Sequence, residues 1–140
     1  MKQATGGSGR AHVLRLQPGE DVRPMLEQWA KDQAIEAAAI TSAVGSLTQA
    51  HIRYANRADG IMITTDLEIV AFSGTLSRHG AHLHIAVADR EGAMLGGHVL
   101  PGCLVRTTLE LVVQEITAVR MLRTKDEVTT YDELDPQPIK

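Results

Sequence analysis

Three of the six histidines in this chain fall between positions 82 and 98, in the stretch HLHIAVADREGAMLGGH. His82 and His84 alternate, so on a strand both side chains point to the same face. The intervening ADREGA has Asp and Gly at the positions that favour a hairpin with a three-residue loop at 90–92. This loop sets His84 directly opposite His98, whereas a two-residue loop would place His98 opposite Leu83, on the apolar face. We therefore expect the three imidazoles on one face of a β-hairpin.

The chemistry that these residues offer is metal binding. Residues directly opposite each other on paired strands have Cβ atoms about 5 Å apart and diagonal ones about 7 Å apart, so three imidazole nitrogens can reach one ion. Three neutral histidines that leave a fourth position open are typical of a zinc site that accepts water or a ligand. Because imidazoles also suit nickel and iron, the prediction is zinc or another divalent transition metal. Gly96 and Gly97 have no side chains and would let a ligand or another subunit's backbone approach.

Two other interpretations of the same stretch remain open. In the first, the histidines line a polar face, hydrogen-bond neighbouring carbonyl groups and bind no metal, because a His-x-His pair is common on strands. In the second, they belong to a cupin-like enzyme. A cupin's acidic ligand follows the second histidine after three or four residues, however, and Glu91 comes later and sits in the turn.

The rest of the pattern predicts the elements that hold this hairpin. A helix is expected at 22–35, with Asp21 as its N-cap and an apolar stripe at helical spacing. Further strands are expected at 11–17, from Ile40 through a turn or bulge at Gly45 and Ser46, at 61–76 with an interruption, at 103–116 and at 118–124. One principal helix and about seven strands predict an α+β domain with a mainly antiparallel sheet. An open sheet and a sheet closed into a barrel both fit this pattern.

The chain is long enough for one domain and too short for two ordinary ones. Residues 1–9 contain GGSG and are expected to form a flexible leader, and residues 10–124 form the domain. Residues 125–140 are acidic and contain proline, so we expect a weakly packed tail.

Composition limits the partners of this domain. The formal net charge is −3, which does not indicate a basic surface for nucleic acid. Only 3% of residues are aromatic, so few side chains can stack on nucleic-acid bases. No apolar stretch approaches the ~20 residues that a membrane helix needs, and the N-terminus does not read as a signal peptide. Cys103 is the single cysteine, which fits a reducing compartment, so we expect a cytoplasmic protein. No nucleotide-cofactor motif is present in the sequence.

A second rank of candidate ligand-binding residues lies outside the hairpin. Arg106 and Glu110 share one face of a predicted strand, and Glu68 is a further candidate. For Arg106 and Glu110, an exposed ion pair of small energetic value is the simpler interpretation.

Several segments together resemble the PPC domain, the "plant and prokaryote conserved" family. They include RLQPGEDV, ITSAVGSLTQAHIRYA, the histidine stretch with its flanks and VRTTLELVV, and they run from about Arg15 to Val113. The resemblance implies an α+β domain that assembles as a homotrimer, with the family's His-x-His and Gly-Gly-His positions at His82, His84 and His98, where some relatives hold a metal such as zinc. In plants the domain is attached to AT-hook segments of nuclear DNA-binding regulators. The only candidate AT-hook here, GGSGRAH, lacks the Arg-Gly-Arg-Pro core that would enter a minor groove.

Three functions compete at this point. The favoured one is a trimeric binding or regulatory module whose histidine cluster holds a metal, with possible protein partners. The alternative is a zinc-dependent hydrolase in which the histidines leave zinc a water ligand of lowered pKa and Glu68 or Glu110 acts as the base. Direct DNA binding ranks last, because Arg10, Arg15, Arg53 and Arg57 do not visibly form one patch.

Overall fold

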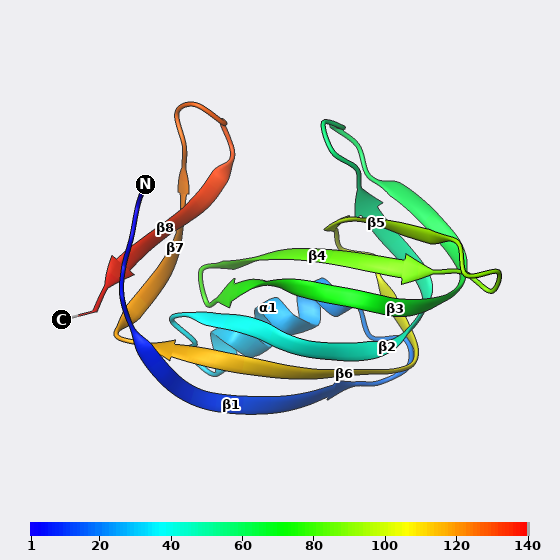
Figure 1. The fold of residues 1–140 in the computed structure, drawn as a ribbon, viewed down its shortest axis with the longest axis horizontal. Helices are drawn as coiled ribbons and strands as arrows, with labels where there is room; N and C mark the ends of the chain where they lie inside the picture. Colours follow the sequence, from blue (N-terminus) through cyan, green and yellow to red (C-terminus); the bar gives the residue numbers. More distant parts are fainter. Residues whose placement is uncertain (140) are drawn as a thin grey trace.

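The computed structural model describes residues 1–139, which form eight strands and one helix (Figure 1). The elements are β1 (Gly7–Leu16), α1 (Val22–Asp32), β2 (Ala38–Arg53), β3 (Ile61–Ser77), β4 (Gly80–Ala88), β5 (Met94–Val99), β6 (Leu104–Thr117), β7 (Val119–Lys125) and β8 (Asp132–Pro138). The predicted α+β class with a mainly antiparallel sheet is confirmed. No helix among the described residues is long and apolar enough to cross a membrane.

Six strands form one antiparallel sheet in the order β1-β6-β2-β3-β4-β5. The end of β2 also pairs with β5, where Ile52 lies opposite Val99 and Arg53 opposite His98. The pairings β2–β3, β3–β4, β4–β5 and β5–β2 therefore close the sheet on itself at one end, which resolves the question of closure that the sequence left open. This closure brings the end of β2 beside the histidine hairpin.

The helix covers one face of the sheet (Figure 1). Its residues Leu26 and Ala30 are fully buried in the main core. The predicted helix end at residue 35 is wrong, because the helix ends at Asp32 and Ala34 takes a left-handed φ of 52°. Ile35 is then free to enter the core, and its amide donates to the carbonyl of Ala30 at 2.9 Å.

Asp21 occupies the predicted N-cap position, but its side chain makes no cap hydrogen bond. One carboxylate oxygen instead accepts a hydrogen bond from the amide of Gly102 at 2.7 Å. The carboxylate therefore ties the helix start to the turn between β5 and β6.

Strands β2 and β3 continue through the positions where the sequence pattern indicates a break. The expected break at Gly45 and Ser46 is a bulge and not a turn, since the register against β6 shifts between Gly45 and Leu47 while the strand continues. A Cβ at Gly45 would overlap the carbonyl of Thr108, so the backbones approach closely here. The expected interruption of β3 is likewise a register shift, between Ile69 and Ala71.

The predicted histidine hairpin is confirmed in register. Asp89 and Ala93 are joined by a backbone hydrogen bond of 3.0 Å, and Gly92 has a φ of 81°, as the three-residue loop requires. His84 lies opposite His98. The alternate side chains of β4, those of Leu83, Ile85 and Val87, are buried in the main core.

The C-terminal residues form a second, two-stranded sheet from β7 and β8. A small separate core holds this hairpin: Val119 and Met121 are buried with Ala37, and Leu134 of β8 packs against them. The segment after residue 125, which the sequence predicts to be weakly packed, therefore includes strand β8. In Figure 1 this hairpin and the connected ends of β2 and β3 project on the same side of the main sheet.

Candidate metal centre

The three histidines of β4 and β5 converge. Nε2 of His82 lies 3.2 Å from Nε2 of His84, and the ring centroid of His98 lies 5.0 Å from that of His82 and 5.7 Å from that of His84. One ligand nitrogen from each ring lies within 4.8 Å of the others. The arrangement brings three imidazoles within reach of one ion, on the face that alternation along the strand predicts.

The local environment disfavours protonation of two of these imidazoles, those of His82 and His98. Burial, together with the charges of His82 and Arg23, lowers the pKa of His98 to about 4. Burial also lowers the pKa of His82, with a further contribution from His84. Because metals bind the unprotonated imidazole, both shifts favour the form that ligates a metal near neutral pH.

Arg23 of the helix holds His98 in place. Its Nη1 lies 3.2 Å from Nε2 of His98 and donates to the carbonyl of Val99 at 2.9 Å. Its Nη2 donates to the carbonyl of Ala81 at 3.3 Å, and its Nε donates to Glu27 at 2.9 Å.

Nδ1 of His98 is buried and has no hydrogen-bond partner among the described residues. Buried polar groups are normally paired, and an unpaired one costs about 1–3 kcal/mol. An unpaired ring nitrogen within a cluster of three imidazoles fits a site that an additional group completes. The donor set therefore suits zinc or another transition metal that prefers nitrogen ligands.

A cavity of about 230 Å³ adjoins His82 and His98. Its walls also carry side chains from the helix, from the end of β2 and from the C-terminal hairpin. These are Arg23, Arg53, Arg123, Tyr131, Asp132 and Glu133.

Sequence reasoning missed these cavity residues because they come from segments far apart in the chain. Asp132 and Glu133 fell in the predicted tail, and nothing in the spacing of the arginines points to one place. Only the acidic and aromatic run YDE marks the tail segment as unusual.

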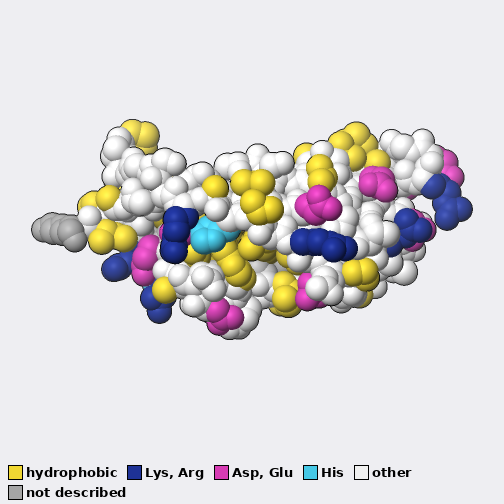
Figure 2. All heavy atoms as spheres, turned by 90° about the horizontal axis from the view of Figure 1, so that it is seen from below, with side chains coloured by type: hydrophobic (Ala, Val, Ile, Leu, Met, Phe, Trp, Pro, Cys, Tyr) yellow, Lys and Arg dark blue, Asp and Glu magenta, His cyan; other side chains and the backbone are white. Residues whose placement is uncertain are grey.

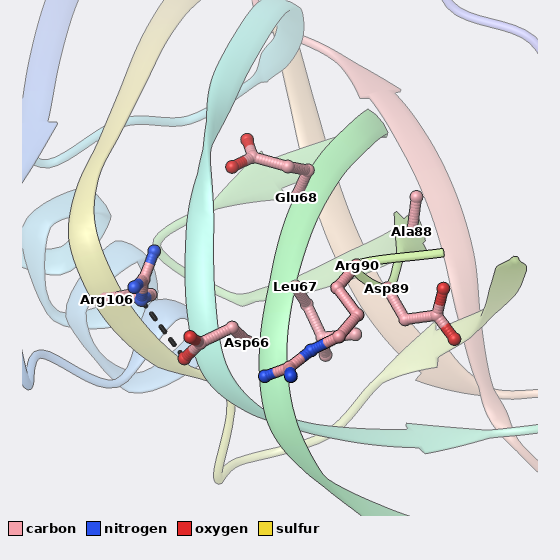
Figure 3. Close-up of a pocket in the computed structure, with 7 residues that line it drawn as sticks. All are labelled: Asp66, Leu67, Glu68, Ala88, Asp89, Arg90 and Arg106. Carbon is pink, nitrogen blue, oxygen red and sulfur yellow. Dashed lines mark ion pairs between the residues drawn. The ribbon is translucent and has the colours of Figure 1, made fainter. Parts of the chain in front are cut away.

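The second-rank residues lie elsewhere. Arg106 and Glu68 line a different cavity of about 390 Å³, where Nε of Arg106 lies 3.1 Å from Asp66 (Figure 3). Figure 3 shows Glu68 directed away from this ion pair. Glu110 is exposed on β6 and accepts a hydrogen bond from Thr108 at 3.4 Å. Neither Glu68 nor Glu110 lines the histidine cavity.

The two glycines of β5 allow close packing of backbones. A Cβ at Gly97 would lie 2.6 Å from the carbonyl oxygen of Arg53, and one at Gly96 would lie 2.8 Å from that of Ile85. Side chains at these positions would push β5 away from its neighbours. The missing side chain at Gly97 thus lets β2 and β5 meet, which places Arg53 beside His98.

The sequence pattern of the Plants and Prokaryotes Conserved (PCC) domain matches residues 3–117, and the chain belongs to this family. Among curated proteins, the chain is 45% identical over 128 residues to the "Bifunctional protein GlmU" of Synechococcus sp. (strain JA-3-3Ab). The match covers 91% of this chain and 21% of that protein, so the chain spans about a fifth of the length of the first curated relatives it matches.

Solved structures share the whole fold. A hypothetical protein from Salmonella enterica is 39% identical, with a TM-score of 0.93 over 98% of this chain and 99% of that one. A metal-containing protein from Archaeoglobus fulgidus is 26% identical, with a TM-score of 0.82 over 96% of this chain and 99% of that one. The family expected from the sequence is therefore confirmed.

Proposed function

We propose that this chain is a binding module that holds zinc or another divalent transition metal through His82, His84 and His98. The observation that carries the proposal is the convergence of three ligand nitrogens within 4.8 Å of one another. The lowered pKa values of His82 and His98 support it, as does the likeness to a metal-containing protein. Zinc held by three histidines keeps a further position for a ligand, which it polarises.

The residues around the cluster have distinct tasks in this proposal. The paired backbones of β4 and β5 set the spacing of the imidazoles, and the core below them fixes the strands. Arg23 orients the His98 ring, and its charge, like burial, disfavours protonation of that ring. Such supporting contacts typically change metal affinity by about 10- to 100-fold when they are removed.

We further propose that the module works as a homotrimer in the cytoplasm. Exposed apolar side chains on three neighbouring parts of the sheet, Val13, Val44 and Val70, offer surface for self-association. The cytoplasmic location rests on the single thiol of Cys103, which is free and buried. Light scattering coupled to size exclusion tests the trimer, and a monomeric mass at micromolar concentration would contradict it.

A zinc-dependent hydrolase is the second candidate, and one observation favours it. The histidine cavity is lined by two carboxylates, and Glu133 is the less exposed of them. Glu133 would take the role of base that the sequence assigned to Glu68 or Glu110. Ester hydrolysis that depends on metal and is lost in Glu133→Gln, with metal content unchanged, would establish this activity.

Direct DNA binding has less support among the residues. Arg10 pairs with Glu115, Arg15 donates to Thr108, and Arg53 lies at the histidine cavity. The face in Figure 2 carries basic and acidic side chains interspersed, without a broad basic patch. Any affinity for duplex DNA that falls steeply with salt would return this function to consideration.

The metal content of the purified, untagged protein tests the main proposal. Wild type should retain about one metal per chain, while His84→Ala and His98→Ala should lose it. His79→Ala is the matched control, because His79 lies outside the cluster and contacts Glu36. Circular dichroism shows whether each variant is folded. A wild-type protein that stays metal-free after incubation with zinc near neutral pH would overturn the proposal.

A further inference from the structure

Arg123 is the least satisfied charged side chain at the histidine cavity. Its Nη2 donates to the hydroxyl of Thr75 at 2.8 Å, but its Nε is buried and has no hydrogen-bond partner among the described residues. No carboxylate of the described part of the chain forms an ion pair with it. A buried donor on a charged group that lacks an acceptor is costly, so this position calls for an acceptor from outside the chain.

Arg53 is the second unpaired guanidinium at this cavity. Its Cζ lies 6.0 Å from the centroid of the Tyr131 ring, and its Nη1 donates only to the carbonyl of Arg57, at 3.3 Å. Within residues 1–139 it has no carboxylate partner. Arg23, by contrast, is committed to Glu27, His98 and two carbonyl groups. Two guanidinium groups are therefore available on the walls beside the histidines.

The charges around the cavity indicate the charge of a ligand that would bind there. Arg23, Arg53 and Arg123 are balanced by three carboxylates, those of Asp132 and Glu133 on the walls and that of Glu27 on Arg23. A divalent metal on the three neutral histidines would then add two positive charges that no described side chain offsets. An anion is the group that restores the balance.

The size and chemistry of the walls narrow the class of anion. A cavity of about 230 Å³ is below the 300–1,000 Å³ usual for drug-sized ligands, so the ligand is small. Guanidinium groups recognise carboxylate and phosphate oxygens, which accept two or more hydrogen bonds. We propose that this cavity binds a small oxyanion, a carboxylate or a phosphate, held by Arg123 and Arg53 beside the histidine-bound metal. The metal and the charge count rest on the proposed function, whereas the unpaired state of Arg123 and Arg53 rests on their own contacts.

Isothermal titration of the zinc-incubated protein with acetate and with inorganic phosphate tests the proposal. Acetamide, which has the shape of acetate without its charge, is the ligand control. We expect at least one anion to bind and acetamide not to bind. Binding of acetate alone identifies a carboxylate site, and binding of phosphate alone identifies a phosphate site. The absence of binding by either anion, or equal binding of acetamide, overturns the proposal.

Arginine variants assign the binding to this cavity. Arg123→Met and Arg53→Gln should each lower the affinity for the anion roughly tenfold or more, because each removes a charge-assisted hydrogen bond. Arg53→Gln keeps the test valid if Arg123→Met fails to fold. Arg106→Gln is the matched control, since that arginine pairs with Asp66 in the other cavity. Equal affinities in the Arg53 and Arg106 variants would place the anion elsewhere and overturn the proposal.

Zinc content separates failure of this proposal from failure of the proposed function. Zinc-loaded protein that binds no anion rejects the oxyanion site and leaves the metal site standing. Protein that takes up no zinc, but binds an anion in a manner that depends on Arg53, rejects the metal site and supports the oxyanion site.

Discussion

Two of the cavities on this domain, the one at Arg106 and the one at the histidines, both contain arginine, yet their electrostatic states differ. In the larger one, Arg106 lies 3.1 Å from Asp66, and both side chains are about half exposed. In the smaller one, Arg123 has a buried Nε without an acceptor among the described residues, beside the histidine cluster. In the larger cavity the arginine is thus paired with a carboxylate and exposed to water, whereas in the smaller one Arg123 keeps a buried donor without an acceptor. This contrast is the reason for proposing the ligand site in the smaller cavity and not in the larger one.

The largest expected effect comes from Gly97→Ala, which attacks the junction that builds the smaller cavity. The added Cβ would meet the carbonyl oxygen of Arg53 at 2.6 Å, so β5 must move away from β2. We expect a loss of roughly 1–3 kcal/mol in the free energy of unfolding and a loss of bound metal. Denaturant unfolding and elemental analysis measure the two effects.

Leu95→Ala on the same strand is the control, because the Leu95 side chain is 42% exposed. It should leave metal content unchanged. A Gly97→Ala protein with wild-type stability and full metal content would show that the junction between β2 and β5 does not position the site.

A smaller effect is expected from pH, and in the histidine cavity it acts through His98. The pKa of His98 is about 4 in the folded chain and about 6.5 when unfolded, so the unfolded chain binds more protons between these values. The contribution of His98 to stability is therefore present above pH 6.5 and is lost as the pH falls toward 4. We expect roughly 1–2 kcal/mol, allowing for solvent screening of this half-buried ring.

Urea unfolding of metal-free protein at pH 7.5, 6 and 5, beside His98→Gln, measures this loss. The variant should show a flatter dependence on pH than wild type. Parallel curves for the two proteins would mean that His98 titrates normally in the folded state.

The C-terminal hairpin should contribute modestly to anion affinity at the smaller cavity. Tyr131→Ala removes the ring beneath Arg53, a contact of about 0.5–1 kcal/mol at exposed sites. We expect anion affinity to fall about two- to fivefold, with metal content unchanged. Calorimetric titration with the better-binding anion measures this change. An unaltered affinity would show that Arg53 is held without Tyr131.

The smallest effect is expected in the larger cavity. A double-mutant cycle of Arg106→Gln and Asp66→Asn should give a coupling energy below about 1 kcal/mol, because exposed ion pairs contribute little. Neither substitution should alter metal content. A coupling of several kcal/mol would remove the contrast between the two cavities.

The histidine hairpin shows how far local patterns reach. Alternation along β4, the loop at 90–92 and the apolar Leu83 together predict the observed pairing of His84 with His98. Each of these signals depends on neighbours within a few residues, so no knowledge of distant segments is needed. The end of the helix was harder to predict from the sequence, because the φ of 52° at Ala34 follows from burying Ile35 in the core.

The sequence by itself determined the family, the α+β class and the three histidines, since their spacing and alternation are local properties. Only the tertiary structure decided what surrounds them. Arg23 arrives from the helix, Arg53 from the closure of β2 onto β5, and Arg123 from the C-terminal hairpin. Such convergence depends on packing between elements distant in the chain, which leaves no periodic signal along the sequence.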